Sequence, residues 1–271
     1  MASLLWSAGP SAVSAQNVLI PNFWDPNERF IKPDLSQRPR LKFLTTTDFP
    51  PFNFIDRRKR LSGFNIELAR AICAELDMLA KCQIQALPWD ELEAALTAGE
   101  GDAIIAGVAI DVESRAKYDF SRVYLQIPGR FIARKDSDLA EPIYEGLFRK
   151  KVGVVAGSGH ERHFQTTFGE RSSNAYPTRQ TAFNALRSGE VDAVFTDALS
   201  ASFWLASPDG DCCGFVGGPY LSEENFGRGL AVAAAKGDAD LIAGFDYALK
   251  SISDKGIFKE LYLRYFPLGL F

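Results

Sequence analysis

Charged and aromatic side chains that follow predicted strands are the best candidates for chemistry in this sequence. Asp197 comes directly after the apolar run DAVFT, so it is expected at the carboxyl end of a strand, where α/β folds place their ligands. Its carboxylate could accept hydrogen bonds from an ammonium group. It could also cap the helix that follows, and the two roles are compatible. The first role predicts an amine-bearing ligand.

Two further features could bind an anion. Arg115 follows the buried run DAIIAGVAI, and its planar guanidinium can hold a carboxylate through two hydrogen bonds. Gly157, Ser158 and Gly159 lie between a predicted strand and a predicted helix, where backbone N–H groups can face an anion. A solvated surface arginine and an ordinary tight turn are the alternatives. Together with Asp197, these residues could hold a zwitterion.

Three aromatic residues could form the apolar wall of a site. Phe49, Phe52 and Trp89 lie in loops directly after predicted strands. The faces of their rings would suit an apolar stem or a cation. Core packing is the alternative for all three, and it is the stronger alternative for Phe52.

Catalysis and metal binding have little support in the sequence. The two histidines, His160 and His163, have no nucleophile pattern beside them, and the four cysteines lack the spacing of a zinc site. We therefore predict no catalytic residue, no metal site and no cofactor.

Bulk properties exclude two classes of partner. The net charge is −4, with both signs scattered along the chain, so the basic stripe that nucleic acid requires is missing. No apolar stretch of about 18 residues is free of charge, which argues against a membrane span. The length of 271 residues suits two lobes of about 100–150 residues each.

The N-terminus and the cysteines point to an exported protein. Residues 1–15 are small and apolar and end in Val-Ser-Ala, like a secretory signal at its cleavage site; a plain tail is the alternative. Cys73 and Cys82 are close enough in the predicted fold to form a disulfide, which suits an oxidising compartment. The pairing of the adjacent Cys212 and Cys213 cannot be derived from the sequence. Free buried thiols are the alternative for both pairs.

From Leu41 onward, predicted strands alternate with predicted helices, which indicates parallel strands covered by helices. The clearest helix is Phe64–Leu79, whose apolar residues recur at the spacing of one buried face. Two segments, LTAGEGDAIIAG and LRSGEVDAVFTD, share the order helix end, glycine, acidic turn and buried strand. The sequence therefore has a doubled architecture. The other predicted elements are strands over 41–48, 83–89, 102–110 and 150–155, helices over 91–98, 160–168 and 180–188, a strand running into a helix over 192–206, and one or two helices over 239–266.

Seven segments of the chain carry a family resemblance. In order they are TTTDFPPFNFID with LSGFNIELARAICAEL, WDELEAALTAGEGDAIIAG, KYDFS, KKVGVVAGS, LRSGEVDAVFTD, FGRGLAVAAAKGDADL and SDKGIFKELYLRYF. From about Leu41 to Phe266 the chain resembles the family 3 solute-binding proteins of bacterial polar amino-acid ABC importers. The resemblance implies a type II periplasmic-binding fold, in which two α/β lobes close around a ligand. It places the two crossovers near Gly129–Lys135 and Tyr220–Phe226.

The same resemblance implies roles for single residues. Asp197 matches the aspartate that accepts the α-ammonium of the ligand. Phe49 and Trp89 match the pair that encloses the ligand side chain. The turn at Ser158 and Gly159 matches the one that contacts the carboxylate from the second lobe.

The sequence departs from the family where the carboxylate is bound by the first lobe. After Gly107, relatives supply a Ser or Thr and then an arginine. Here the hydroxyl position is Ala109, and the arginine position falls on Ser114, one residue before Arg115. Either the turn shifts and Arg115 still reaches the ligand, or the carboxylate clamp is altered. In the second case the ligand could be an amine-bearing compound other than a standard α-amino acid, with Arg130 as a possible substitute anion partner.

We therefore expect a monomeric periplasmic binding protein, not an enzyme, that delivers a small polar, amino-acid-like solute to the membrane subunits of an ABC importer. The alternatives are a cyclohexadienyl-dehydratase-like enzyme, with Glu161 as the candidate acid, and a sensory partner that presents its ligand. The expected division is a signal remnant over 1–15, an irregular extension over 16–40, a first lobe of 41–131 with 225–271, and a second lobe of 132–224.

Overall fold

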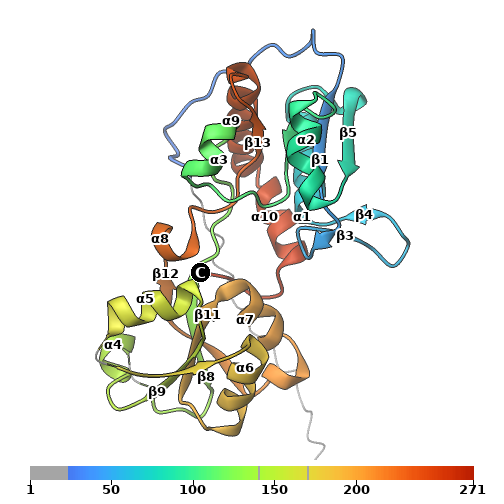
Figure 1. The fold of residues 1–271 in the computed structure, drawn as a ribbon. Helices are drawn as coiled ribbons and strands as arrows, with labels where there is room; N and C mark the ends of the chain where they lie inside the picture. The colour runs from blue at the N-terminus through green and yellow to red at the C-terminus, as the bar shows by residue number, and fades with distance from the viewer. Residues whose placement is uncertain (1–23, 140, 170) are drawn as a thin grey trace, which may run out of the picture.

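The computed structural model describes residues 24–139, 141–169 and 171–271, so the expected signal remnant at 1–15 lies outside the described residues. The described chain contains two five-stranded sheets and one three-stranded sheet. Figure 1 shows the two larger sheets in separate lobes, each covered by helices. The predicted α/β fold with two sheet–helix lobes is confirmed.

The sheet of the first lobe has the order β5-β1-β6-β13-β7. Strand β1 is parallel to β5 and β6, whereas β13 is antiparallel to β6 and β7. Leu41 and Phe43 belong to one core cluster and Leu44 to another, because successive side chains of a strand point to opposite faces. The strands are β1 (Leu41–Thr45), β5 (Cys82–Ala86), β6 (Ala103–Ile104), β7 (Tyr118–Phe120) and β13 (Ala233–Ala235).

Helices cover both faces of the first sheet. Helices α1, α9 and α10 pack against one another, and their apolar side chains join the larger core cluster. Leu92 and Leu96 of α2 join Leu44 on the other face. The helices are α1 (Phe64–Glu75), α2 (Leu92–Thr97), α3 (Val112–Lys117), α9 (Ala239–Asp254) and α10 (Ile257–Tyr265), with 3-10 turns at Leu79–Lys81 and Trp89–Glu91. The segment predicted as a proline-broken loop forms the small sheet of β2 (Asp48–Phe49), β3 (Asn53–Ile55) and β4 (Leu61–Ser62).

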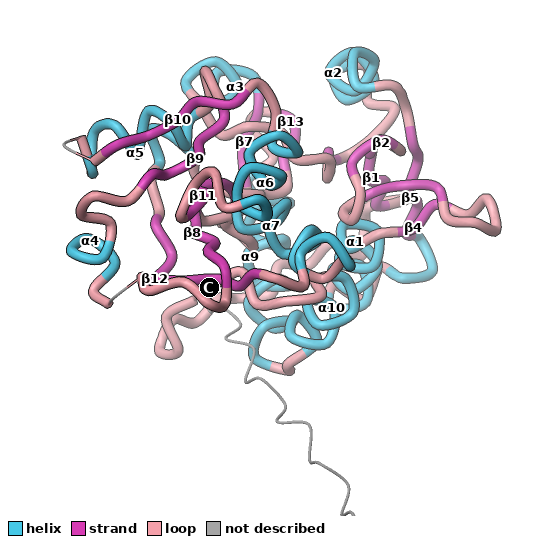
Figure 2. The backbone as a smooth tube through the Cα atoms, turned by 90° about the horizontal axis from the view of Figure 1, so that it is seen from below, coloured by secondary structure: helices cyan, strands magenta, loops and turns pink. Residues whose placement is uncertain are grey.

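The sheet of the second lobe has the order β10-β9-β11-β8-β12. Strands β10, β9 and β11 are parallel, whereas β8 is antiparallel to β11 and to β12. Figure 2 shows α4 and α5 on one side of this sheet and α6 and α7 on the other, and a separate apolar cluster fills each side. The strands are β8 (Gly129–Arg134), β9 (Lys151–Val155), β10 (Ser172–Tyr176), β11 (Ala193–Asp197) and β12 (Cys213–Tyr220). The helices are α4 (Ile143–Gly146), α5 (Gly159–Phe168), α6 (Arg179–Ser188), α7 (Ala198–Leu205) and α8 (Glu223–Phe226), with a 3-10 turn at Pro208–Gly210.

Two chain passages join the lobes, one between β7 and β8 and one between β12 and β13. They run side by side, because Leu125 and Leu230 form an antiparallel bridge. The sequence predicts the first crossover near Gly129–Lys135, and this position is wrong, since residues 129–134 form β8 inside the second sheet. The passage lies just upstream, over residues 121–128.

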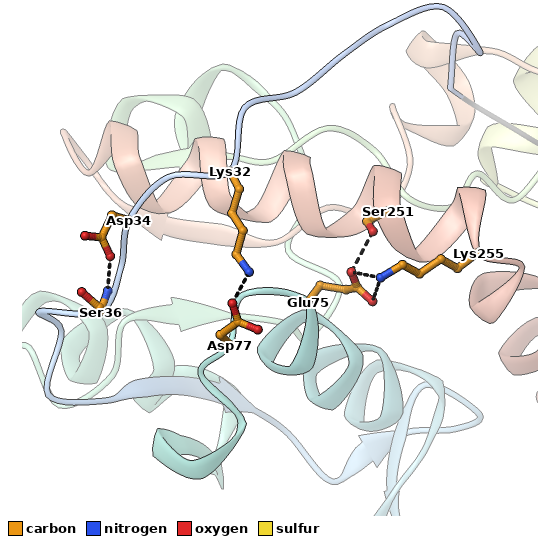
Figure 3. A network of polar contacts seen from close by, with 7 residues as sticks. All are labelled: Lys32, Asp34, Ser36, Glu75, Asp77, Ser251 and Lys255. Carbon is orange, nitrogen blue, oxygen red and sulfur yellow. Dashed lines mark hydrogen bonds and ion pairs between the residues drawn. The ribbon is translucent and has the colours of Figure 1, made fainter.

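The described part of the N-terminal extension, residues 24–40, contains no helix or strand. It is fixed to the first lobe by buried Trp24 and Leu35 and by ion pairs. Figure 3 shows Lys32 of the extension paired with Asp77 beyond α1, close to the bonds that Glu75 of α1 accepts from α9. A further ion pair joins Glu28 to Arg122 at the start of the first crossover.

Both cysteine pairs form disulfides. The bond between Cys73 and Cys82 joins α1 to the start of β5, with the two Cα atoms 6.0 Å apart. Cys212 and Cys213 are also bonded to each other, at the start of β12. All four cysteines are therefore in the oxidised form that suits an exported protein.

Candidate functional site

The carboxyl ends of the parallel strands in the second lobe lie at one edge of its sheet. Strands β9, β10 and β11 end at Val155, Tyr176 and Asp197. Asp197 lies beside Gly129, where the first crossover enters the sheet from the other lobe. This edge therefore faces the first lobe, and the starts of α5, α6 and α7 gather along it.

The first lobe presents the equivalent edge. Strands β1, β5 and β6 end at Thr45, Ala86 and Ile104. Ile104 pairs with Ala233, the first residue of β13, which the second crossover enters. The loops after these three strands carry Phe49, Trp89 and the segment from Gly107 to Ala109, so the candidate residues of both lobes lie on facing edges.

Asp197 holds two partners within its own lobe. Its Oδ1 accepts a hydrogen bond of 2.7 Å from the backbone N–H of Ser200, which caps α7. Its Oδ2 lies 2.9 Å from Nε of Arg179, the first residue of α6. Only 16% of the Asp197 side chain is exposed, against 57% for Arg179. The carboxylate is thus an electrostatically paired, largely buried acceptor at the facing edge.

The glycine turn before α5 is already bonded to its own helix. Ser158 Oγ accepts the N–H of Glu161, and the Glu161 carboxylate accepts the N–H of Gly157 at 2.7 Å. A Cβ on Gly159 would collide with the carbonyl oxygen of Asn225 in α8, so glycine is needed for this close approach. A ligand carboxylate at this turn would have to compete with Glu161.

His160 lies beside this turn as a half-buried side chain. Its ring stacks on Phe226 of α8 with centroids 4.5 Å apart. Burial lowers the pKa of His160 to about 4, although the nearby Asp197 carboxylate acts in the opposite direction. Its Nε2 atom is buried and has no hydrogen-bond partner among the described residues.

Phe49 is held between a ring and a backbone segment. It stacks on Phe52 with centroids 4.8 Å apart. A Cβ on Gly107, whose φ is +84°, would stand 2.8 Å from its Cε1 atom. Phe52 itself is fully buried and also contacts Phe64 and Phe266. Core packing, the alternative for Phe52, is therefore its role in this structure, whereas Phe49 keeps part of its ring exposed.

Trp89 is the most exposed aromatic side chain at the facing edge, with 54% of its surface accessible. It separates two hollows in the first lobe. One, of about 250 Å³, lies over the loops after β1 and β5. The other, of about 300 Å³, lies between α2 and α3 and includes Val108, Ala109 and Ser114 in its wall.

The structure places Arg115 away from this second hollow. Arg115 is exposed on α3, and its neighbour Ser114 lines the hollow instead. Asp111 caps α3 by accepting the N–H of Ser114, whose hydroxyl accepts the N–H of Asp111 in return, so the helix start fixes which residue faces inward. The remaining charged residues of the wall are mostly acidic: Asp90, Glu93, Asp111, Glu113 and Lys117.

Arg130, the suggested substitute anion partner, is engaged elsewhere. It is buried, donates to the carbonyl oxygens of Gly217 and Leu270, and stacks over Phe215 at 4.5 Å. Burial lowers its pKa. It joins the start of β8 to the C-terminal segment.

A buried polar chain orders the loops of the first lobe. Asn53 donates to Thr46, Asn65 donates to Asn53, and the Tyr124 hydroxyl donates to Asn65, at 2.7, 3.0 and 2.8 Å. It runs from the loop that carries Phe49 to the first crossover.

Arg179 is the residue at this edge that sequence reasoning missed. A signal for it exists: a cation in the first turn of a helix opposes the helix dipole, so an arginine directly after the cap Thr178 calls for a local explanation. Among the described residues, no group of three or more His, Cys, Asp or Glu side chains could hold a metal ion. The described helices include none that is both long and apolar enough to cross a membrane.

Comparison with known proteins finds one family model over most of the chain. The model of the bacterial extracellular solute-binding proteins, family 3, matches residues 41–268. The lysine/arginine/ornithine-binding periplasmic protein of Escherichia coli (strain K12) is 30% identical over 230 residues, covering 84% of this chain and 87% of that protein. The ABC transporter arginine-binding protein 1 of the same organism is 28% identical over 229 residues, covering 84% and 91%.

Solved structures agree with these matches. An ancestral arginine-binding protein bound to arginine is 31% identical, with a TM-score of 0.51 over 84% of this chain and 99% of that one. The unliganded, open L-cystine solute receptor of Neisseria gonorrhoeae is 20% identical and has a TM-score of 0.74 over 85% and 94%. The second likeness concerns the fold alone.

Proposed function

The chain belongs to family 3 of the bacterial extracellular solute-binding proteins, and we propose that its two facing edges close around an amino acid or a related small, amine-bearing solute. The family confirms the prediction of an exported solute-binding protein. One of the two Escherichia coli relatives is named as a periplasmic binding protein and the other as a binding protein of an ABC transporter. We accordingly assign this chain to delivery of its solute to an ABC importer.

The observation that carries the proposal is the position of Asp197. Its buried carboxylate stands at the edge of the second lobe that faces Phe49 and Trp89 of the first. An ammonium group would be held by Asp197, and the attached side chain would lie against the two aromatic rings. Because contacts to both lobes exist only when the lobes are together, the ligand would shift the protein toward a closed form.

Basic amino acids are the first candidates within this class. The relatives named above bind lysine, arginine and ornithine. Here the exposed face of Trp89 and the carboxylates of Asp90 and Glu93 border the same hollow. That surrounding favours a cationic side chain over an anionic one.

We further propose how the chain divides. The first lobe would comprise residues 41–128 with 230–266, and the second lobe 129–229, since β8 begins at Gly129 and the second crossover ends at the bridge of Leu230. This shifts the expected boundaries, 131/132 and 224/225, by a few residues each. The protein would act as a monomer.

A thermal-shift screen tests the proposed function. Purified protein is heated with each amino acid, with opines and with polyamines. A true ligand at 100 times its Kd stabilises the folded state by about 2.7 kcal/mol, which raises Tm measurably. A screen without any stabilising compound overturns the proposal.

The enzyme alternative has its own test. Glu161, its candidate acid, accepts the N–H of Gly157 and sits in the first turn of α5, which is an ordinary structural role. We expect no turnover of prephenate by the purified protein. Turnover that disappears in Glu161→Gln would establish the enzyme instead.

A further inference from the structure

The edge of the second lobe carries both signs of charge within one ion pair. The closest contact between Arg179 and Asp197 joins Nε to Oδ2, at 2.9 Å. The two terminal nitrogens of Arg179 make no hydrogen bond to any described residue, and 57% of the side chain is exposed. The terminal nitrogens of the guanidinium therefore keep N–H donors that a ligand could use.

The fold itself gives no reason for an arginine at this position. Helix α6 is already capped by Thr178 and Thr181, which exchange hydrogen bonds between side chain and backbone. A cation at the first residue of the helix is disfavoured by the helix dipole. The contact with Asp197 is what offsets this cost, so the two side chains form one unit.

Asp197 keeps acceptor capacity beside Arg179. A carboxylate has about four lone-pair sites, and among the described residues only the Ser200 N–H occupies one of them with a hydrogen bond. Oδ2 is buried and its contact with Arg179 lacks hydrogen-bond geometry. An ammonium group could add to this carboxylate without displacing Arg179.

The described residues that line the hollow beside Trp89 offer no comparable anion site. Arg115 does not line the hollow beside Trp89. The cation that does, Lys117, is paired with Glu93 and Glu113. A carboxylate placed there would meet an excess of negative charge.

We infer that Arg179 contacts the ligand and binds its α-carboxylate, while Asp197 binds its α-ammonium. The inference rests on the proposed function and deepens it: the ligand is an α-amino acid, not a simple amine, and both of its charges are recognised by the second lobe. The pair Arg179–Asp197 has no net charge. When a zwitterion binds, its carboxylate is next to the arginine and its ammonium next to the aspartate, so every charge has a partner of opposite sign. Such pairing limits the desolvation cost of closing the site.

The test compares amino acids with the amines that lack their carboxylate. Isothermal titration calorimetry is run on the full chain with L-arginine and agmatine, L-lysine and cadaverine, and L-histidine and histamine. The wild type should bind the amino acid of at least one pair, and prefer it to the amine. In Arg179→Gln the affinity for that amino acid should fall about 10- to 100-fold, the usual loss for a charged hydrogen-bonded contact, with little change for the amine. Arg179→Lys, which keeps the charge but not the fork, should fall between the two.

Two controls test whether the effect is specific to Arg179 and whether the variant is folded. Arg187→Gln removes another arginine of α6, paired with Asp209 at the far end of the helix, and should leave both affinities unchanged. Unfolding of the free variants reports whether Arg179→Gln retains its fold.

Other outcomes overturn the inference. If Arg179→Gln still prefers the amino acid to the amine, or if Arg115→Gln loses this preference instead, Arg179 does not bind the ligand carboxylate. If Arg179→Gln binds amino acid and amine more tightly, Arg179 competes with the ligand for Asp197. If the affinity for both falls equally, Arg179 only positions the Asp197 side chain. If the wild type binds no compound of the three pairs while the broader screen finds a ligand that lacks an α-carboxylate, this inference fails and the proposed function stands. If that screen also finds nothing, both fail.

Discussion

Phe49 is wedged against Gly107: a Cβ atom on Gly107 would stand 2.8 Å from Cε1 of the Phe49 ring. The other side of the ring stacks on Phe52, which is itself fully buried. The orientation of this candidate ligand contact is therefore restricted by the loop that follows β6.

Gly107→Ala should weaken ligand binding about tenfold or more. The new methyl group displaces the Phe49 ring, and the φ of +84° adds a strain of about 1–2 kcal/mol to the folded state. Gly99→Ala is the matched control, since Gly99 also has a positive φ, +71°, but no atom within 4 Å of the added Cβ. Urea unfolding should show a loss of stability for both variants, and calorimetry a loss of affinity for Gly107→Ala alone. If Gly107→Ala and the wild type bind the ligand equally well, Phe49 does not contact the ligand.

Trp89→Ala should cost ligand affinity about 10- to 100-fold while changing the free energy of unfolding by less than about 1 kcal/mol. Its side chain is 54% exposed, so the fold gains little from it, whereas aromatic contacts often dominate binding. Phe203→Ala, at a side chain 42% exposed on α7, serves as the control and should bind normally. A Trp89→Ala protein with wild-type affinity contradicts the proposed aromatic wall.

The two disulfides should differ in their contribution to stability. Cys73 and Cys82 are nine positions apart in the sequence, and closing a loop of that size is worth about 2.5 kcal/mol in unfolded-chain entropy. Cys212 and Cys213 are adjacent and close almost no loop. Urea unfolding of Cys73→Ala/Cys82→Ala should therefore show a large loss and that of Cys212→Ala/Cys213→Ala a small one. The reverse order would refute the loop argument.

His160 should make the protein sensitive to mild acid. The folded-state pKa is lowered from 6.5 to about 4, so the neutral form is favoured in the folded protein. Its contribution is fully present above pH 6.5 and is lost as the pH falls toward about 4. Between pH 7.5 and pH 5 this amounts to about 2 kcal/mol.

Urea unfolding at several pH values, for the wild type and His160→Gln, isolates this effect from that of the carboxylates. The wild type should lose about 2 kcal/mol more than the variant between pH 7.5 and 5. Above pH 7.5 the two stability curves should run parallel. Parallel curves throughout would falsify the assignment of a half-buried, neutral histidine.

The elements that the sequence predicted well have strong local patterns. The predicted helix Phe64–Leu79 is found as α1, which ends earlier, at Glu75, and the predicted tail helices correspond to α9 and α10. Their buried residues recur at helical spacing. The residues expected at strand ends, Asp197 among them, lie at the facing edges because the runs before them form β1, β5 and β11.

What was missed depends on contacts distant in sequence. The sequence predicted a crossover where β8 lies, and the glycines of β12 interrupt its strand pattern. The two strands pair antiparallel with each other, a contact that the local sequence does not reveal. The buried run 102–110 gives only the short strand β6, because the chain then leaves the sheet to reach Gly107. Arg179 was missed because β10, SSNAY, is a polar edge strand without a hydrophobic alternation, and only that strand places Arg179 beside Asp197.

Asp197 divides its two oxygens between different tasks, since Oδ1 holds the start of α7 and Oδ2 faces Arg179. A substitution of Asp197 during evolution would therefore destabilise the start of α7 and also weaken ligand binding. Arg179 has no comparable structural role, because α6 is capped by Thr178 and Thr181. We expect specificity in close relatives of this chain to drift through position 179 while position 197 stays fixed.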